Sequence, residues 1–161
     1  DYLNVYMGVG HMIVGKSSAV IKQPVEQVFQ FVVVEFAKNY RRWSPEVQRL
    51  EVLTNGPLRV GTRARQIRVD QGRRSDTCFQ VTALQPMQKV CFAEISRKFQ
   101  GEYSMQSQEG GTELRFEFRL NKIDLFMRPF EKLIRIAIQD GAERTVHNIK
   151  RLVETERSSE Q

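Results

Sequence analysis

Few residues in this sequence have both the type and the spacing that chemistry at a site requires. Residues 10–17 read Gly-His-Met-Ile-Val-Gly-Lys-Ser, which matches a phosphate-binding loop whose backbone amides and lysine hold phosphates at a helix N-terminus. The context of such a loop is missing, because Pro24 follows only seven residues after Ser17 and the alternating strand–helix order of nucleotide-binding folds does not follow. We therefore expect no nucleotide binding.

The histidines and cysteines are too few and too scattered to predict a metal site. His11 lies near the N-terminus, and His147 falls on the polar face of the last predicted helix. Cys78 and Cys91 are the only cysteines and form no Cys-x-x-Cys spacing, so neither a zinc site nor a disulfide framework is expected. We predict no metal, no cofactor, reduced thiols and a cytoplasmic location.

Glu94 and Tyr103 are the candidates for acid–base chemistry. Glu94 shares a strand face with Val90 and Phe92, and a carboxyl desolvated there is suited to proton transfer. Alternatively, Glu94 ends its strand and reaches solvent or pairs with an arginine of the 63–68 strand. Tyr103 either donates a hydrogen bond to a ligand or packs its ring in the core with a solvated hydroxyl.

The excess of positive charge is concentrated in one segment. The net charge is +6, and residues 59–76 carry six arginines against two aspartates. Such a cluster can attract anionic lipid head groups, nucleic acid or an acidic partner; alternatively it is a solvated strand face, since the arginines alternate with apolar residues. No aromatic residue lies among them for base stacking. We expect weak contact with an anionic membrane surface and no specific nucleic acid.

The elements that would position these residues follow from three changes of hydrophobic period. Residues 13–22 alternate as in a strand, and Pro24 then opens a helix at its first position, where the missing N–H costs nothing. Apolar residues recur at helical spacing from Val25 to Phe36, which predicts a buried helix face. The polar and basic segment 37–45 predicts a helix–turn junction.

From Val47 to Asn121 the period is two, which indicates short strands joined mainly by hairpins. Turn signals divide this region at residues 55–57, 71–72, 85–86 and 110–111. The last strand is the clearest, because its apolar residues all fall on one face and its charged residues on the other. Its apolar residues are Leu114, Phe116, Phe118 and Leu120.

A helical period returns after Asn121 and lasts to about Thr155. Asp124 is the predicted N-cap, and Arg128-Pro129 predicts a kink or restart in the first turns. A chain of 161 residues fits one domain, which we assign to residues 13–155. Residues 1–12 are predicted to be a leader or cloning remnant, and residues 156–161 a polar tail. No apolar run approaches the ~20 residues needed to cross a bilayer, so we expect a soluble protein.

This order of elements predicts an α+β fold in which the dry face of a curved antiparallel sheet is covered by the long C-terminal helix. In its order and in several short motifs, the chain resembles the START-like polyketide cyclase and lipid-transport superfamily, whose members share a helix-grip fold. The motifs are Pro24-Val25-Glu26-Gln27-Val28-Phe29, Trp43-Ser44-Pro45-Glu46-Val47, Gly56-Pro57-Leu58-Arg59-Val60-Gly61-Thr62, Gly72-Arg73-Arg74 and Gly110-Gly111-Thr112. One departure is Glu35-Phe36-Ala37, where the family often has Asp followed by Pro.

The resemblance implies about seven strands wrapped around the C-terminal helix, two short helices after the first strand, and a cavity for a hydrophobic molecule such as a lipid, polyketide or quinone. Our leading hypothesis is a non-catalytic binding or transport protein. The alternatives are a cyclase or dehydratase that uses polar cavity residues, and a partner-binding regulatory module that uses the arginine segment. The large residues expected on inward faces, as cavity lining or plain core, are Trp43, Phe79, Phe92, Phe99, Tyr103, Phe116, Phe118, Phe126, Phe130 and Ile134.

Overall fold

The computed structural model describes residues 12–158. The predicted leader apart from Met12, and residues 159–161 of the predicted tail, lie outside the described residues. The elements are, in chain order, β1 (Ile13–Ile21), α2 (Val25–Phe29), the π-helical turn η1 (Gln30–Val34), α3 (Phe36–Trp43), β2 (Val47–Val52), β3 (Arg63–Asp70), β4 (Arg73–Gln85), β5 (Lys89–Glu94), β6 (Phe99–Gln108), β7 (Gly111–Leu120), the 3-10 helix η2 (Leu125–Phe130) and α4 (Glu131–Ser158). Within residues 12–158, no helix combines the length and hydrophobicity needed to span a bilayer.

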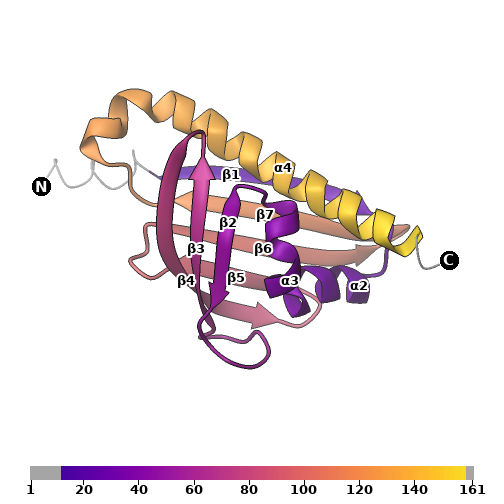
Figure 1. Cartoon of the computed structure of the whole chain (residues 1–161). Coiled ribbons are helices and arrows are strands. Elements are labelled where there is room, and N and C mark those ends of the chain that lie inside the picture. Colours follow the sequence, from indigo (N-terminus) through magenta and orange to yellow (C-terminus); the bar gives the residue numbers. More distant parts are fainter. Residues whose placement is uncertain (1–11, 159–161) are drawn as a thin grey trace, which may run out of the picture.

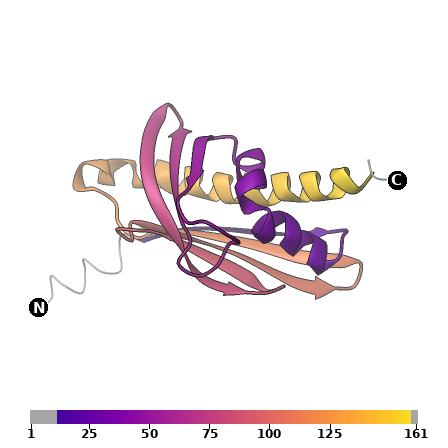
Figure 2. The same cartoon turned by 60° about the horizontal axis from the view of Figure 1, so that its bottom comes forward.

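The strands form one seven-stranded sheet in the order β1-β7-β6-β5-β4-β3-β2, and all neighbouring strands are antiparallel. Figure 1 shows α4 running along the sheet beside β1, with α2 and α3 near the C-terminal end of α4. Turned by 60°, the β3–β4 hairpin rises from the sheet beside α4 (Figure 2). This arrangement confirms the predicted α+β helix-grip fold and its two short helices after the first strand.

Contacts between α4 and β1 fix the helix on the edge of the sheet. The Gln139 side chain accepts a hydrogen bond from the Lys16 amide at 3.1 Å and donates to the Lys16 carbonyl at 2.9 Å. It thereby satisfies backbone groups that an edge strand would otherwise expose. Gly15 permits the close approach, because a Cβ there would lie 2.7 Å from Ile138. Lys16 and Ser17 of the phosphate-loop match therefore lie within a paired strand and do not begin a helix.

The core is built from the inner face of the sheet, α2, η1, α3 and the second half of α4. Residues of α4 at helical spacing are buried against the sheet, namely Ala142, Val146, Ile149 and Val153. At the α3 end the core is aromatic: Phe36 stacks on Tyr40 with ring centroids 4.7 Å apart and on Phe92 at 4.8 Å. This cluster packs α3 against β4 and β5.

Two local predictions need correction. Segment 37–45 is mostly helical, because α3 runs from Phe36 to Trp43 after a break at Glu35. Asp124 precedes η2 without a side-chain capping bond, and its carboxylate instead lies 3.9 Å from Lys98 Nζ. The predicted restart at Pro129 is present, since α4 begins directly after the 3-10 helix that contains this proline. The proline, which has no N–H to donate, therefore lies outside the regular hydrogen bonding of α4.

Candidate functional site

A cavity of about 390 Å³ lies between the inner face of the sheet, α3 and the middle of α4. Its apolar lining comes mainly from aromatic rings on α3 and on β4 to β7. Seven of the ten residues predicted to face a cavity line it: Trp43, Phe79, Phe92, Phe99, Tyr103, Phe116 and Phe118. From α4 it is lined by small or polar residues, including Ala137, Gly141 and Thr145.

The other residues singled out from the sequence lie elsewhere. Phe126, Phe130 and Ile134 do not belong to the lining, and Phe126 and Phe130 are largely exposed on η2. Glu94 is buried but also lies outside the lining. Its Oε2 accepts hydrogen bonds from the Ser96 hydroxyl at 2.8 Å and the Lys98 amide at 3.3 Å, so Glu94 closes the turn between β5 and β6.

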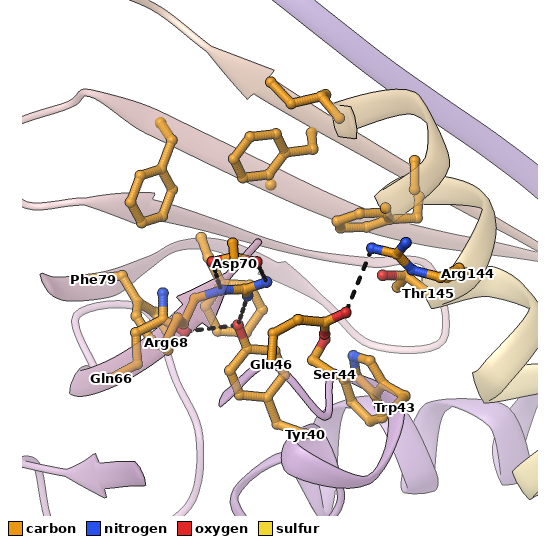
Figure 3. Close-up of a pocket in the computed structure, with 18 of the residues that line it drawn as sticks. Tyr40, Trp43, Ser44, Glu46, Gln66, Arg68, Asp70, Phe79, Arg144 and Thr145 are labelled. Carbon is orange, nitrogen blue, oxygen red and sulfur yellow. Dashed lines mark hydrogen bonds and ion pairs between the residues drawn. The ribbon is translucent and has the colours of Figure 1, made fainter. Parts of the chain in front are cut away.

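One wall of the cavity is polar and is organised by Arg68 on β3. Arg68 Nη1 donates to the Tyr40 hydroxyl at 3.0 Å, and Tyr40 in turn donates to Gln66 Oε1 at 2.8 Å. Two further bonds of 3.1 Å join the guanidinium to the Asp70 carboxylate. Figure 3 shows this chain of side chains from β3 and α3 facing the aromatic rings across the cavity.

A second polar pair spans the cavity edge between the start of β2 and α4. Arg144 Nη2 lies 3.4 Å from Glu46 Oε1 (Figure 3). Asn148, one turn further along α4, donates to the Trp43 carbonyl at 3.1 Å and so fixes the end of α3 against the helix. Both carboxylates of the lining, Glu46 and Asp70, are thus paired with arginines.

Several buried polar atoms of the lining have no acceptor within the described part of the protein. The Tyr103 hydroxyl accepts a bond from Trp43 Nε1 at 3.2 Å, but no described residue accepts its proton, and none accepts from Gln66 Nε2. The hydroxyls of Ser44 and Thr145 likewise make no hydrogen bond among residues 12–158. All four residues are buried and line the cavity. These four side chains are therefore available as hydrogen-bond donors to a ligand oxygen in the cavity.

Tyr103, Tyr40 and Arg68 keep fixed protonation states near neutral pH. Burial raises the pKa of Tyr103, and the neighbouring Tyr40 acts in the same direction. Burial also raises the pKa of Tyr40, although Arg68 opposes the shift. Burial alone would lower the pKa of Arg68, but Tyr40 and Asp70 outweigh it and the pKa is raised. Near neutral pH the wall therefore offers neutral hydroxyl donors beside a permanent positive charge.

The buried Tyr103 hydroxyl predicts a specific loss of stability in alkali. Because its pKa is raised in the folded state, its contribution is present below the unfolded value of about 10 and is lost as pH rises above it, by at most about 1.4 kcal/mol per pH unit. Urea unfolding between pH 8 and 11 should show a steeper loss of stability for the parent protein than for Tyr103→Phe. Parallel curves for the two proteins would contradict this placement of the hydroxyl.

The sequence pattern alone did not single out the residues that organise the polar wall: Tyr40, Gln66 and Arg68. The interpretation of the arginine segment as one solvated face holds for only part of it. Arg65 pairs with Asp76 on the outer face, whereas Arg68 has the same parity along β3 as the buried Ala64 and Gln66. Because alternate residues of a strand share a face, the spacing of Arg68 from Ala64 and Gln66 is the feature of the sequence from which its inward position could be predicted.

The site is an amphipathic cavity with several hydrogen-bond donors and no metal-binding cluster among the residues described. No group of three His, Cys, Asp or Glu side chains within residues 12–158 can hold a metal ion. The carboxylates of the lining are paired with arginines, and the residues that carry the donors line the same cavity as the aromatic rings. Such a cavity can hold a largely apolar molecule and bind its oxygen atoms in a defined orientation.

The sheet, the long helix and the cavity between them define a protein of the helix-grip class. The family described as "Polyketide cyclase / dehydrase and lipid transport" matches residues 12–154. The chain belongs to this family. A search of curated proteins found no match.

Solved structures share the fold at low identity. A protein from Thermus thermophilus is 20% identical with a TM-score of 0.69, over 87% of this chain and 96% of that one. The Zhui aromatase/cyclase from a Streptomyces species is 12% identical with a TM-score of 0.73, over 89% and 94%. A Polyketide_cyc-like protein from Corynebacterium glutamicum is 21% identical with a TM-score of 0.64, over 92% and 95%.

Proposed function

We propose that this protein binds a hydrophobic, oxygen-bearing small molecule in the cavity and acts as a non-catalytic binding or transport protein. The observation that carries the proposal is the set of buried donors without acceptors among residues 12–158 on the wall of an aromatic cavity. The rings offer apolar contact to a planar or lipid-like body, while Tyr103 and Gln66 offer hydrogen bonds to its oxygen atoms. The cytoplasmic location predicted from two unpaired cysteines is part of the same proposal.

The chemistry of the wall selects among ligands. Arg68 and Arg144 are both paired with carboxylates, so the wall presents balanced charge to an occupant. The unpaired groups are neutral amide and hydroxyl donors, which suit carbonyl oxygens of a polyketide, quinone or ester. We therefore expect an uncharged carbonyl compound to bind more tightly than a hydrocarbon of the same shape.

Trp43 provides a direct test, because it is the only tryptophan in the chain and lines the cavity. The probes are 9-fluorenone and fluorene, which share a three-ring skeleton and differ by the carbonyl oxygen. Fluorenone should quench Trp43 fluorescence in a saturable manner, and fluorene should compete for the same site about tenfold more weakly, as expected for one or two hydrogen bonds.

Tyr103→Phe keeps the ring and removes the hydroxyl donor. Fluorenone affinity should fall by about five- to tenfold, whereas fluorene affinity should change by less than about twofold. Equal losses for the two probes would mean that Tyr103 acts only by packing. No saturable quenching by either probe in the parent protein would contradict the proposed binding function itself.

A cyclase or dehydratase is the second candidate, supported by the family and by the likeness to an aromatase/cyclase. In this chain the candidate acid–base groups are Tyr40 and Tyr103, because Glu94 does not line the cavity and the lining carboxylates Glu46 and Asp70 are paired with arginines. Arg68 beside Tyr40 would then stabilise an enolate oxygen. Incubation with a poly-β-ketone thioester would decide, since a catalyst gives a cyclised product that Tyr40→Phe no longer forms.

A further inference from the structure

A group of large apolar side chains is exposed where the C-terminal helical region begins. These residues, here called the apolar tip, are between one half and three-quarters exposed. They are Leu125, Phe126, Phe130, Leu133 and Ile136. Their concentration in η2 and the first turns of α4 sets them apart from the single exposed apolar residues found on any protein surface.

The position of the tip explains why the rest of the described chain does not cover it. In Figure 1 the η2 segment and the first turns of α4 extend to the end of the sheet, beside the tip of the β3–β4 hairpin. The first fully buried apolar residue of α4 lies further along, at Ala142. Leu133 continues toward the start of α4 the i, i+4 row of the cavity residues Gly141 and Thr145, but at this end of the helix its side chain is 64% exposed.

Basic side chains surround the apolar tip. Within residues 12–158, Arg128 and Lys132 make no ion pair, and neither does Lys122 before η2. The acidic residues of the segment form ion pairs with other basic residues: Asp124 lies 3.9 Å from Lys98, and Glu131 lies 2.9 Å from Arg135. The segment therefore presents free positive charge around its apolar side chains.

The β3–β4 hairpin adds to this charge. Arg73 Nη1 lies 3.7 Å from Met127 Sδ in η2, which brings the hairpin turn beside the tip. Arg74 is exposed next to it. Two segments far apart in the sequence thus contribute to one basic, apolar surface.

We propose that the apolar tip and its basic surround dock on an anionic lipid bilayer. Apolar side chains enter the boundary between head groups and acyl chains while lysines and arginines contact anionic head groups, and the two contributions add. A second copy of this chain is the poorer occupant, because a symmetric contact would bring the same positive charges together. The inference does not depend on what the cavity holds, although Ala137 and Ile138 of its lining directly follow Ile136.

Flotation with lipid vesicles tests the proposal. The full chain should float with vesicles in which about a third of the phosphatidylcholine is replaced by phosphatidylglycerol, bind pure phosphatidylcholine far more weakly, and lose binding as salt is raised. Replacement of three tip residues by serine (Phe126→Ser, Phe130→Ser, Leu133→Ser) should weaken anionic vesicle binding by about tenfold or more. The double variant Arg128→Glu and Lys132→Glu should lose it similarly.

Exposed apolar residues elsewhere provide the matched control. Val34→Ser and Val60→Ser remove side chains that are 56% and 60% exposed and should leave vesicle binding unchanged. Tip variants should also bind fluorenone as the parent does, so failure of docking and failure of ligand binding are separable. The proposal is overturned if the parent ignores anionic vesicles, if the control variants lose binding equally, or if sedimentation shows a dimer that the tip variants abolish.

Discussion

Gly141→Phe is expected to abolish ligand binding without unfolding the protein. Gly141 lies inside α4 and lines the cavity, and a Cβ there would meet only the Arg144 side chain at 4.0 Å. A phenyl ring therefore has room to extend into the space that a ligand would occupy. Fluorenone affinity measured by Trp43 quenching should fall by about a hundredfold or more, since the ring replaces the ligand's contacts with the aromatic lining.

Gly141→Ala is the matched control for this prediction. Alanine relieves the cost of glycine in a helix interior and should stabilise the protein by about 0.5–1 kcal/mol, while its methyl group leaves most of the cavity open. Urea unfolding should therefore show both variants at least as stable as the parent, and only Gly141→Phe should lose fluorenone. If Gly141→Phe bound the probe like the parent, the cavity would not be the binding site.

Gly111→Ala is expected to cause the largest loss of stability. Gly111 begins β7 with φ of +152°, and a Cβ there would lie 2.0 Å from the Ile21 carbonyl oxygen. Because that oxygen belongs to the backbone of β1, the clash can be relieved only by moving paired strands. Overpacking and backbone strain together should cost about 3 kcal/mol or more, measured as a lower free energy of unfolding.

A substitution at the neighbouring Gly110 distinguishes the cost of the clash from the cost of the backbone conformation. Gly110 has φ of +83°, but a Cβ there would meet nothing within 4 Å. Gly110→Ala should therefore cost only the left-handed conformation, about 1–2 kcal/mol. Equal effects at the two positions would show that steric contact between β7 and β1 is less tight than the structure indicates.

Periodic patterns predicted most of the fold because burial acts on every residue of an element. The alternation of β7 places Leu114 and Phe116 in the core, and the proline in η2 marks the restart of the last helix. Capping and helix boundaries were less predictable, since they depend on single tertiary contacts. Asp124 satisfies a local capping rule, yet its carboxylate lies near Lys98.

The site was predictable in its apolar part and not in its polar part. Aromatic residues on inward strand faces line the cavity because no other described element fills the space beside the small residues of α4. Glu94 alternates with inward-facing residues of its strand, but its carboxylate accepts hydrogen bonds from the β5–β6 turn. A periodic pattern does not reveal such hydrogen bonds. Arginine is usually exposed, which favours a solvated face for Arg68, whereas Tyr40 and Asp70 hold it on the cavity wall.

Native mass spectrometry with 9-fluorenone tests the central claim most directly, namely that the cavity between the sheet and α4 binds a hydrophobic oxygen-bearing molecule. The structure predicts one bound fluorenone per parent chain, an equal complex for Gly141→Ala and no complex for Gly141→Phe. Complexes of equal abundance in all three proteins, or none in the parent at saturating probe, would contradict the proposed binding site.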